Sequence, residues 1–80
     1  MAERYTLTKD GRAKFYRTKI RMGMEDADKM TGYKVLDCLF TRGASTMEEL
    51  EKFSGKSYEE IVHDIESLMP WGYIEEYEGR

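Results

Sequence analysis

A helix-capping signal that occurs twice, twelve residues apart, constrains this sequence more than any other feature. Ser45 and Ser57 are each followed three residues later by a glutamate, Glu48 and Glu60, which is the spacing of a capping box. In such a box the serine hydroxyl accepts from the glutamate amide, and the carboxylate reaches back to the serine amide. Gly55 suits the left-handed residue that ends a helix. The pattern predicts a short helix, a tight turn and a second helix.

Apolar spacing indicates the buried sides of these helices and predicts another helix before them. The last helix has apolar residues at i, i+4 and i+7 and stops at Pro70. The earlier helix ends at about residue 42 and begins at about 26 or 31, since Asp26 and Thr31 both suit its cap. The residues predicted to face the core are Tyr33, Val35, Leu36, Leu39 and Phe40, then Met47, Leu50 and Phe53, and finally Ile61, Ile65 and Leu68.

Both ends of the chain contain a short β-strand pattern, in residues 4–8 and 71–77. Thr8 then suits the cap of a helix over residues 8–22. Because Asp10-Gly11 is also a strong turn signal, the second strand of a hairpin is the alternative for residues 9–22. We favour the helix, whose predicted apolar face is Ala13, Tyr16, Ile20 and Met24.

The order of these elements resembles the winged helix-turn-helix family over about half of the chain. In that family the strand after the third helix leads into a returning strand that reads Tyr-x-Leu-Thr-x-x-Gly and enters a last helix. Here that motif stands at the N-terminus, as Tyr5-Thr-Leu-Thr-Lys-Asp-Gly11, so the sequence resembles a circularly permuted winged helix. The other motifs that carry the resemblance are Val35-Leu36-x-x-Leu39, Gly43-Ala-Ser-Thr46, Glu49-Leu50, Ser54-Gly55-x-Ser57, Ile61-x-x-x-Ile65-x-x-Leu68 and Gly72-Tyr73-Ile74.

The resemblance implies one α+β domain, mostly helical, over residues 1–80. It has a winged helix-like three-helix core, a short antiparallel two-stranded sheet and an additional N-terminal helix. Residues 4–8 are expected to pair with about 72–77. A lone strand would leave a row of amides and carbonyls unpaired, and the N-terminal strand is the spare partner.

Charge is distributed unevenly along the chain. Residues 1–21 hold seven basic and two acidic side chains, a net charge of +5, whereas residues 22–80 hold six basic and fourteen acidic ones, a net charge of −8. An anionic partner such as DNA should therefore meet the N-terminal segment first. An ordinary solvated helix face and an acidic partner protein are equally compatible with it. The candidate phosphate-binding residues are Lys9, Arg12, Lys14, Arg17, Lys19 and Arg21.

The third helix of a helix-turn-helix enters the DNA major groove, and here its exposed side is predicted to be acidic. His63 is a candidate phosphate or base contact on it, although a lone solvated histidine is the simpler interpretation. Carboxylates against phosphates are repulsive, which argues against DNA binding by this helix. The exposed residues expected there are Tyr58, Glu59, Val62, His63 and Glu66.

An apolar patch is the alternative site. Tyr58 and Val62 lie four residues apart on the exposed side of the third helix, and Trp71 and Tyr77 are of the residue types that anchor interfaces. For Trp71 the favoured interpretation is instead that it closes the bottom of the core.

Nothing in the sequence indicates an active site, a cofactor or a metal. Cys38 lacks a histidine at a recognisable spacing and is expected to be a buried apolar residue. A single cysteine favours a reducing compartment, and the N-terminus lacks the apolar stretch of a secretory signal, so we expect a cytoplasmic protein without a membrane partner. The predicted function is nucleic-acid binding of a transcription-regulator type. A protein-interaction module that kept the fold and lost DNA binding is the alternative.

Overall fold

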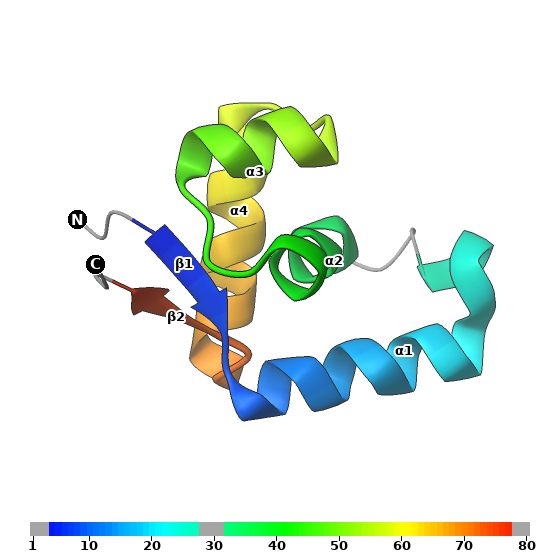
Figure 1. The fold of residues 1–80 in the computed structure, drawn as a ribbon. Coiled ribbons are helices and arrows are strands. Elements are labelled where there is room, and N and C mark those ends of the chain that lie inside the picture. Colours follow the sequence, from blue (N-terminus) through cyan, green and yellow to red (C-terminus); the bar gives the residue numbers. More distant parts are fainter. Residues whose placement is uncertain (1–3, 28–31, 78–80) are drawn as a thin grey trace.

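A computed structural model of the chain describes residues 4–27 and 32–77, which form four α-helices and a two-stranded antiparallel sheet (Figure 1). The fold is α+β and mostly helical, as predicted. In chain order the elements are β1 (Arg4–Leu7), α1 (Lys9–Ala27), α2 (Tyr33–Arg42), α3 (Met47–Ser54), α4 (Tyr58–Leu68), the single 3₁₀ turn η1 (Met69–Trp71) and β2 (Ile74–Tyr77).

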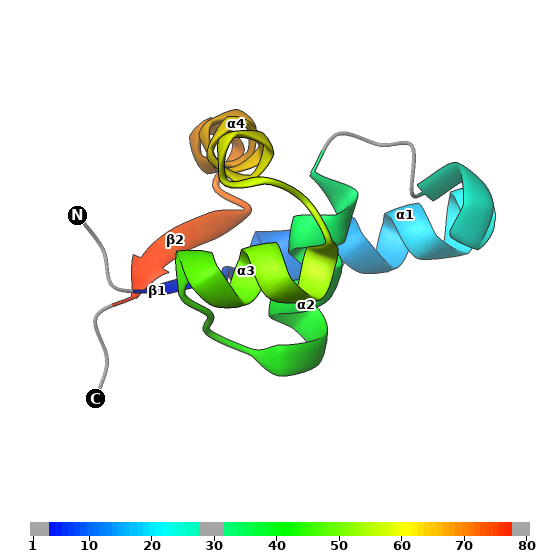
Figure 2. The same cartoon turned by 90° about the horizontal axis from the view of Figure 1, so that it is seen from above.

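The core lies where α2, α3 and α4 meet the inner side of the sheet. Helix α2 packs against α1, α3 and α4, and α1 runs along one side of this body and extends beyond it (Figures 1 and 2). The predicted stripe of α4 and, except for the partly buried Phe40, that of α2 are buried, together with Leu50 of α3, whereas Met47 is partly buried. The buried apolar residues are Leu7, Phe15, Tyr33, Val35, Leu36, Cys38, Leu39, Leu50, Ile61, Ile65, Leu68 and Ile74.

The two ends of the chain pair with each other as predicted. Arg4 lies opposite Tyr77 and Leu7 lies opposite Ile74 in antiparallel register. The other edge of β1 is bridged by Ser45, which exchanges two backbone hydrogen bonds with Tyr5 at 2.8 and 2.9 Å. This bridge ties the loop between α2 and α3 to the sheet.

The capping box of α3 is shifted by one residue from its predicted position. Thr46, not Ser45, is the N-cap, and its partner is Glu49, not Glu48. Ser45 is unavailable because its backbone pairs with Tyr5 and its hydroxyl donates to the Gly43 carbonyl at 2.9 Å.

The capping box of α4 is confirmed. Ser57 Oγ accepts from the Glu60 amide, and the Glu60 carboxylate accepts from the Ser57 amide. The turn before this helix also matches the sequence, since Gly55 ends α3 with φ of 75°. That left-handed conformation favours glycine.

Residues 9–22 are helical, which excludes the hairpin, but the predicted buried face of α1 is wrong. Phe15 and Thr18 are buried, whereas Tyr16 and Ile20 are 53% and 81% exposed and Ala13 is exposed too. The close contact of Gly11 and the packing of Phe15 determine which side of α1 is buried. The side chain of Met24 lies outside the described part of α1.

The start of α2 also differs from the prediction. Helix α2 begins at Tyr33 with Gly32 as its N-cap, and no side chain caps it. Asp26 is part of α1 instead, because α1 continues five residues beyond its predicted end. Thr31 lies outside the described residues.

Besides Tyr16, two aromatic residues predicted to be inside are exposed. Phe53 is 39% exposed, and its ring lies under the Arg42 guanidinium, with Cζ 3.4 Å from the centroid. Trp71 is 71% exposed and belongs to η1 rather than to the strand, which begins at Ile74. Pro70 lies within this 3₁₀ turn, whose tight geometry separates Trp71 from the buried stripe of α4.

Candidate nucleic-acid interface

The first turn of α1 is fixed to the loop between η1 and β2. Thr8 caps the helix by accepting from the Gly11 amide at 3.0 Å, and its own hydroxyl donates to the Gly72 carbonyl. The Thr8 amide donates to the Tyr73 carbonyl at 3.0 Å. Gly11 is required at this contact, because a Cβ there would lie 1.9 Å from the Tyr73 carbonyl oxygen.

Phe15 holds the next turn of α1 against α2. Its ring stacks on Phe40 with centroids 4.7 Å apart and on Tyr33 with centroids 5.3 Å apart. Tyr16 packs edge-on against the outer part of Phe40, at 5.1 Å. Gly11, Phe15 and Thr18 define the buried side of α1. The other residues of α1 up to Arg21 face solvent or lie at the edges of the contact between α1 and the rest of the protein.

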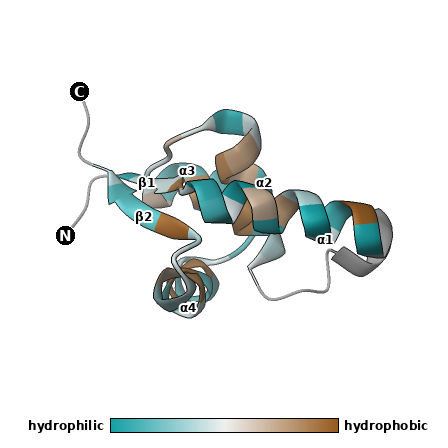
Figure 3. Cartoon of the chain, turned by 90° about the horizontal axis from the view of Figure 1, so that it is seen from below, coloured by the Kyte–Doolittle hydropathy of each residue, from teal (hydrophilic) through white to brown (hydrophobic). Residues whose placement is uncertain are grey.

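The six predicted cations of α1 all lie on its accessible surface. Lys14 is half-buried, and the other five are exposed. Within the described residues, the ion pairs join Arg4 to Glu49 and Lys56 to Asp64, and neither includes a cation of α1. Figure 3 shows hydrophobic segments between the hydrophilic ones along α1. The structure therefore brings Lys9, Arg12, Lys14, Arg17, Lys19 and Arg21 together on one helix without carboxylate partners among the described residues.

Three of these cations lie over aromatic rings. The Arg12 guanidinium is 5.9 Å from the Phe40 centroid, and Lys19 Nζ is 5.8 Å from that of Phe15. Lys14 Nζ is 5.9 Å from the centroid of Tyr73, an aromatic partner that the sequence analysis missed. These separations permit a cation–π attraction that leaves the charge available to a ligand.

Trp71 lies next to this surface. Its ring stacks on Tyr73, with centroids 6.3 Å apart and ring planes 10° apart. Lys14, Tyr73 and Trp71 therefore form a row from α1 to an exposed indole. Trp71 and Tyr77 are exposed, and neither is among the residues that line the groove containing Tyr58 and Val62.

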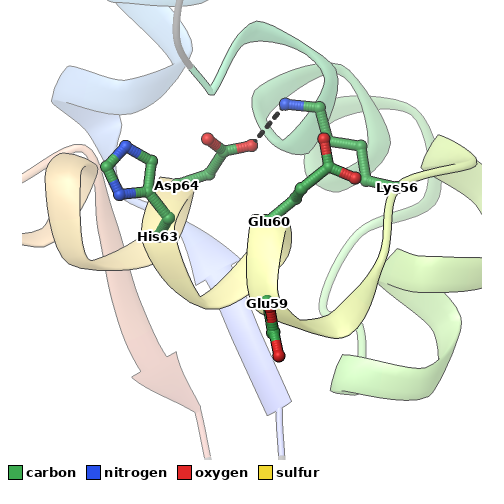
Figure 4. A pocket seen from close by; sticks show the side chains of 5 residues that line it. All are labelled: Lys56, Glu59, Glu60, His63 and Asp64. Atoms are coloured by element: carbon green, nitrogen blue, oxygen red, sulfur yellow. Dashed lines mark hydrogen bonds and ion pairs between the residues drawn. The ribbon is translucent and has the colours of Figure 1, made fainter.

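The accessible side of α4 is acidic. A pocket of about 260 Å³ is lined by Lys56, Glu59, Glu60, His63 and Asp64. Lys56 Nζ lies 2.6 Å from Asp64 Oδ2, and the Asp64 carboxylate is almost fully buried. In Figure 4 Lys56 reaches toward Asp64, Glu59 points away from this pair, and His63 lies beside Asp64. His63 is therefore exposed, as predicted, but lies among carboxylates on a different helix from the six cations.

The capping carboxylates on this side are held in their ionised form. Hydrogen bonds from the Thr46 backbone and hydroxyl lower the pKa of Glu49, and the nearby Arg4 guanidinium contributes to the same shift. Hydrogen bonds from the Ser57 backbone and hydroxyl lower the pKa of Glu60. These carboxylates keep their negative charge at neutral pH, which makes α3 and α4 a poor surface for phosphates.

Tyr58 and Val62 line a second groove, of about 210 Å³, with Tyr5, Met47, Ile65 and Glu66. Burial raises the pKa of the Tyr5 phenol, and the neighbouring Glu76 and Tyr58 raise it further. Tyr5 of β1 and Met47 of α3 were not predicted as part of this site, because the sequence does not show that residues from three separate elements line one groove.

Cys38 is buried, and burial raises the pKa of its thiol, with Asp37 contributing. A raised pKa disfavours the nucleophilic thiolate. Within the described residues no group of three or more histidine, cysteine, aspartate or glutamate side chains is placed to hold a metal ion. None of the helices in that part of the chain has the length and apolarity needed to cross a membrane.

Comparison of the chain with protein-family models, with curated proteins and with solved structures finds no match in any of the three.

Proposed function

We propose that this chain is a circularly permuted winged-helix domain that binds nucleic acid through its phosphate backbone, with α1 as the contact surface. Three helices followed by a strand, and the antiparallel pairing of that strand with β1, support the permuted arrangement. A regulatory role in the cytoplasm fits such an activity and the lone Cys38.

The observation that carries the proposal is the concentration of positive charge on α1 between Lys9 and Arg21. Cations that neutralise phosphates release condensed counterions, and this release supplies most of the affinity of non-specific binding. Within the described residues, none of the six cations of α1 is in an ion pair, so a polyanion would not have to displace an internal carboxylate from them.

The acidic character of α4 supports assigning the contact to α1 rather than to the helix that the fold resemblance favours. Glu59 and Glu66 are exposed on α4, and the cation of its pocket, Lys56, is engaged by Asp64. A phosphate approaching α4 would meet carboxylates first, which is repulsive.

A titration with random-sequence duplex DNA at 50 and 200 mM salt tests the proposal, with backbone amides followed by NMR. We expect the amides of residues 9–21 to shift and the affinity to fall steeply with salt. The variant Arg17→Glu/Arg21→Glu should lower the slope of log affinity against log salt by the amount that corresponds to about two lost phosphate contacts. Lys34→Glu/Lys52→Glu is the matched control, because it changes the net charge equally at exposed positions of α2 and α3. Equal losses in the two variants, or no shift at low salt, would contradict the proposal.

The groove beside Tyr58 supports a second candidate function, the docking of an apolar side chain from a partner protein. Its volume of about 210 Å³ and its aromatic and aliphatic lining are suited to one such side chain. Tyr58→Ala, at an exposed position, should abolish partner binding in this case and leave DNA binding by α1 unchanged.

A further inference from the structure

The solvent-facing side of α1 is not a continuous basic surface, because Ala13 and Ile20 follow Lys9 along it. Opposite the buried Gly11 and Phe15, helical periodicity places Ala13 and Ile20 in one line, seven residues apart. Ile20 is 81% exposed, more than any other large hydrophobic side chain in the described part of the chain. A surface that only tracked phosphates would have no use for an isoleucine at its most prominent position.

Cations flank this line of residues on both sides. Arg12 and Lys19, two helical turns apart, lie on the side that faces α2, where their charges are near the rings of Phe40 and Phe15. The opposite side is directed toward the η1–β2 loop, where Lys14 lies near the Tyr73 ring. The cations on that side are Lys14, Arg17 and Arg21, and Asp10 is the one acidic residue between Lys9 and Arg21.

We propose that α1 lies in the major groove of duplex DNA, with its two rows of cations on the two phosphate backbones and with Ile20 against thymine methyl groups. This inference rests on the proposed function and specifies its ligand. The major groove of B-form DNA is about 12 Å wide and admits an α-helix, and the thymine C5-methyl is the apolar group on its floor. The major groove of A-form RNA is too narrow for side chains to read.

Access to α1 is consistent with this position. Helix α1 is 19 residues long, which corresponds to about 28 Å, and it extends beyond the body formed by α2, α3 and α4 (Figures 1 and 2). The acidic pocket of α4 is built from a separate helix and turn. Trp71, the one tryptophan of the chain, lies beside the Lys14 side, where its fluorescence can report binding.

The first test asks whether the cations on both sides of Ala13 and Ile20 contact DNA. Arg12→Glu/Lys19→Glu and Arg17→Glu/Arg21→Glu change the charge equally on opposite sides of the helix. If both strands are in contact, each variant should lower the slope of log affinity against log salt on a 20-base-pair duplex. The decrease should correspond to about two lost phosphate contacts. A loss confined to one variant would mean that α1 lies along a single strand, which overturns the groove position.

The second test asks what Ile20 contacts. Trp71 fluorescence is titrated with an alternating A–T duplex and with the same duplex in which deoxyuridine replaces thymidine and removes every C5-methyl. We expect binding to the uracil duplex to be weaker by about fourfold for each methyl group in contact. Ile20→Ala should bind both duplexes equally, whereas Tyr58→Ala, an exposed aromatic position on α4, should keep the difference.

The outcomes separate the two proposals. Salt-dependent binding with equal affinity for the two duplexes would overturn the role of Ile20 and leave the proposed function standing. Tighter binding to a double-stranded RNA or to single-stranded oligothymidine of the same length would overturn the duplex DNA groove as the ligand. Absence of salt-dependent binding to all of these nucleic acids would overturn the proposed function itself, and the inference with it.

Discussion

Helices α1 and α4 differ in how much of their surface the fold uses. Helix α4 buries a regular stripe of Ile61, Ile65 and Leu68, and hydrogen bonds cap its first turn. Among its described side chains, helix α1 is attached mainly by Phe15, with Tyr16 edge-on against Phe40, and by the close approach of Gly11. The hydrophobic pattern of α4 is thus explained by packing, whereas α1 keeps cations and an isoleucine that packing does not explain. Residues unexplained by the fold are the better guide to function.

Removal of the aromatic anchor of α1 should have the largest effect. Phe15→Ala is expected to lower the free energy of unfolding by about 4 kcal/mol, because it empties a site stacked between Tyr33 and Phe40. Ile20→Ala, on the same helix but exposed, should change it by less than about 0.5 kcal/mol. Urea denaturation followed by circular dichroism measures both. Similar losses would show that the packing of α1 differs from that described.

The ion pair between Lys56 and the buried Asp64 carboxylate of α4 should have the next largest effect. Lys56→Met leaves the Asp64 carboxylate buried without its cation, which should lower the free energy of unfolding by about 3 kcal/mol. Replacing both partners, as Lys56→Met/Asp64→Leu, should recover most of this loss, because no charge then remains buried. Urea midpoints of the two variants show whether the ion pair itself stabilises the fold or whether the loss comes from leaving one charge buried without its partner. A double variant no more stable than the single one would contradict this account.

Gly11→Ala tests the attachment of α1, because its effect on stability should be opposite in sign to that in an ordinary exposed helix. In an exposed helix interior this substitution stabilises by about 1 kcal/mol. Here the new methyl group would meet the Tyr73 carbonyl oxygen, so we expect a loss of about 2 kcal/mol. Thermal unfolding decides between the two, and a raised melting temperature would show that the first turn of α1 does not lie against the η1–β2 loop.

Local patterns in the sequence were sufficient for most of the fold. The Ser57 box, the left-handed Gly55 and the stripe of α4 depend on near neighbours in the chain, and the pairing of the chain ends followed from the need to satisfy strand hydrogen bonds. The errors arose where a distant contact decides. Ser45 caps no helix because Tyr5 occupies its backbone groups.

The candidate site was predictable in composition but not in arrangement. The cations of α1 are visible in the sequence, yet apolar spacing assigned Ile20 to the core. Spacing alone does not show that Gly11 faces a carbonyl or that Thr18 is buried, and these two contacts set the orientation of the helix. Trp71 was expected inside because of its residue type, but the 3₁₀ turn that contains Pro70 leaves it exposed. The rings that lie beneath Arg12 and Lys14 belong to α2 and to the segment before β2, which only the tertiary fold brings to α1.

The smallest expected effect is a difference in how the stability contributed by the caps of α1 and of α3 and α4 depends on pH. The pKa values of Glu49 and Glu60 are lowered in the folded protein by bonds to the Thr46 and Ser57 caps. Their contribution to stability is therefore complete above the ordinary glutamate pKa of about 4.3 and is lost as the pH falls through the lower folded values. The α1 cap lacks this dependence, because Gly11 occupies the position where a capping glutamate would stand.

The matched variants are Glu49→Gln/Glu60→Gln and Glu48→Gln/Glu59→Gln, which remove equal charge from the first turns of α3 and α4. Glutamine can still accept the capping bond, so the first variant isolates the ionised carboxylate. At pH 7 it should have the lower urea midpoint of the two, and its difference from the unmodified protein should shrink as the pH is lowered from 5 to 3. Equal midpoints for both variants at pH 7 would mean that the capping carboxylates contribute no more than ordinary first-turn acids, and the contrast between the caps of α1 and α4 would disappear.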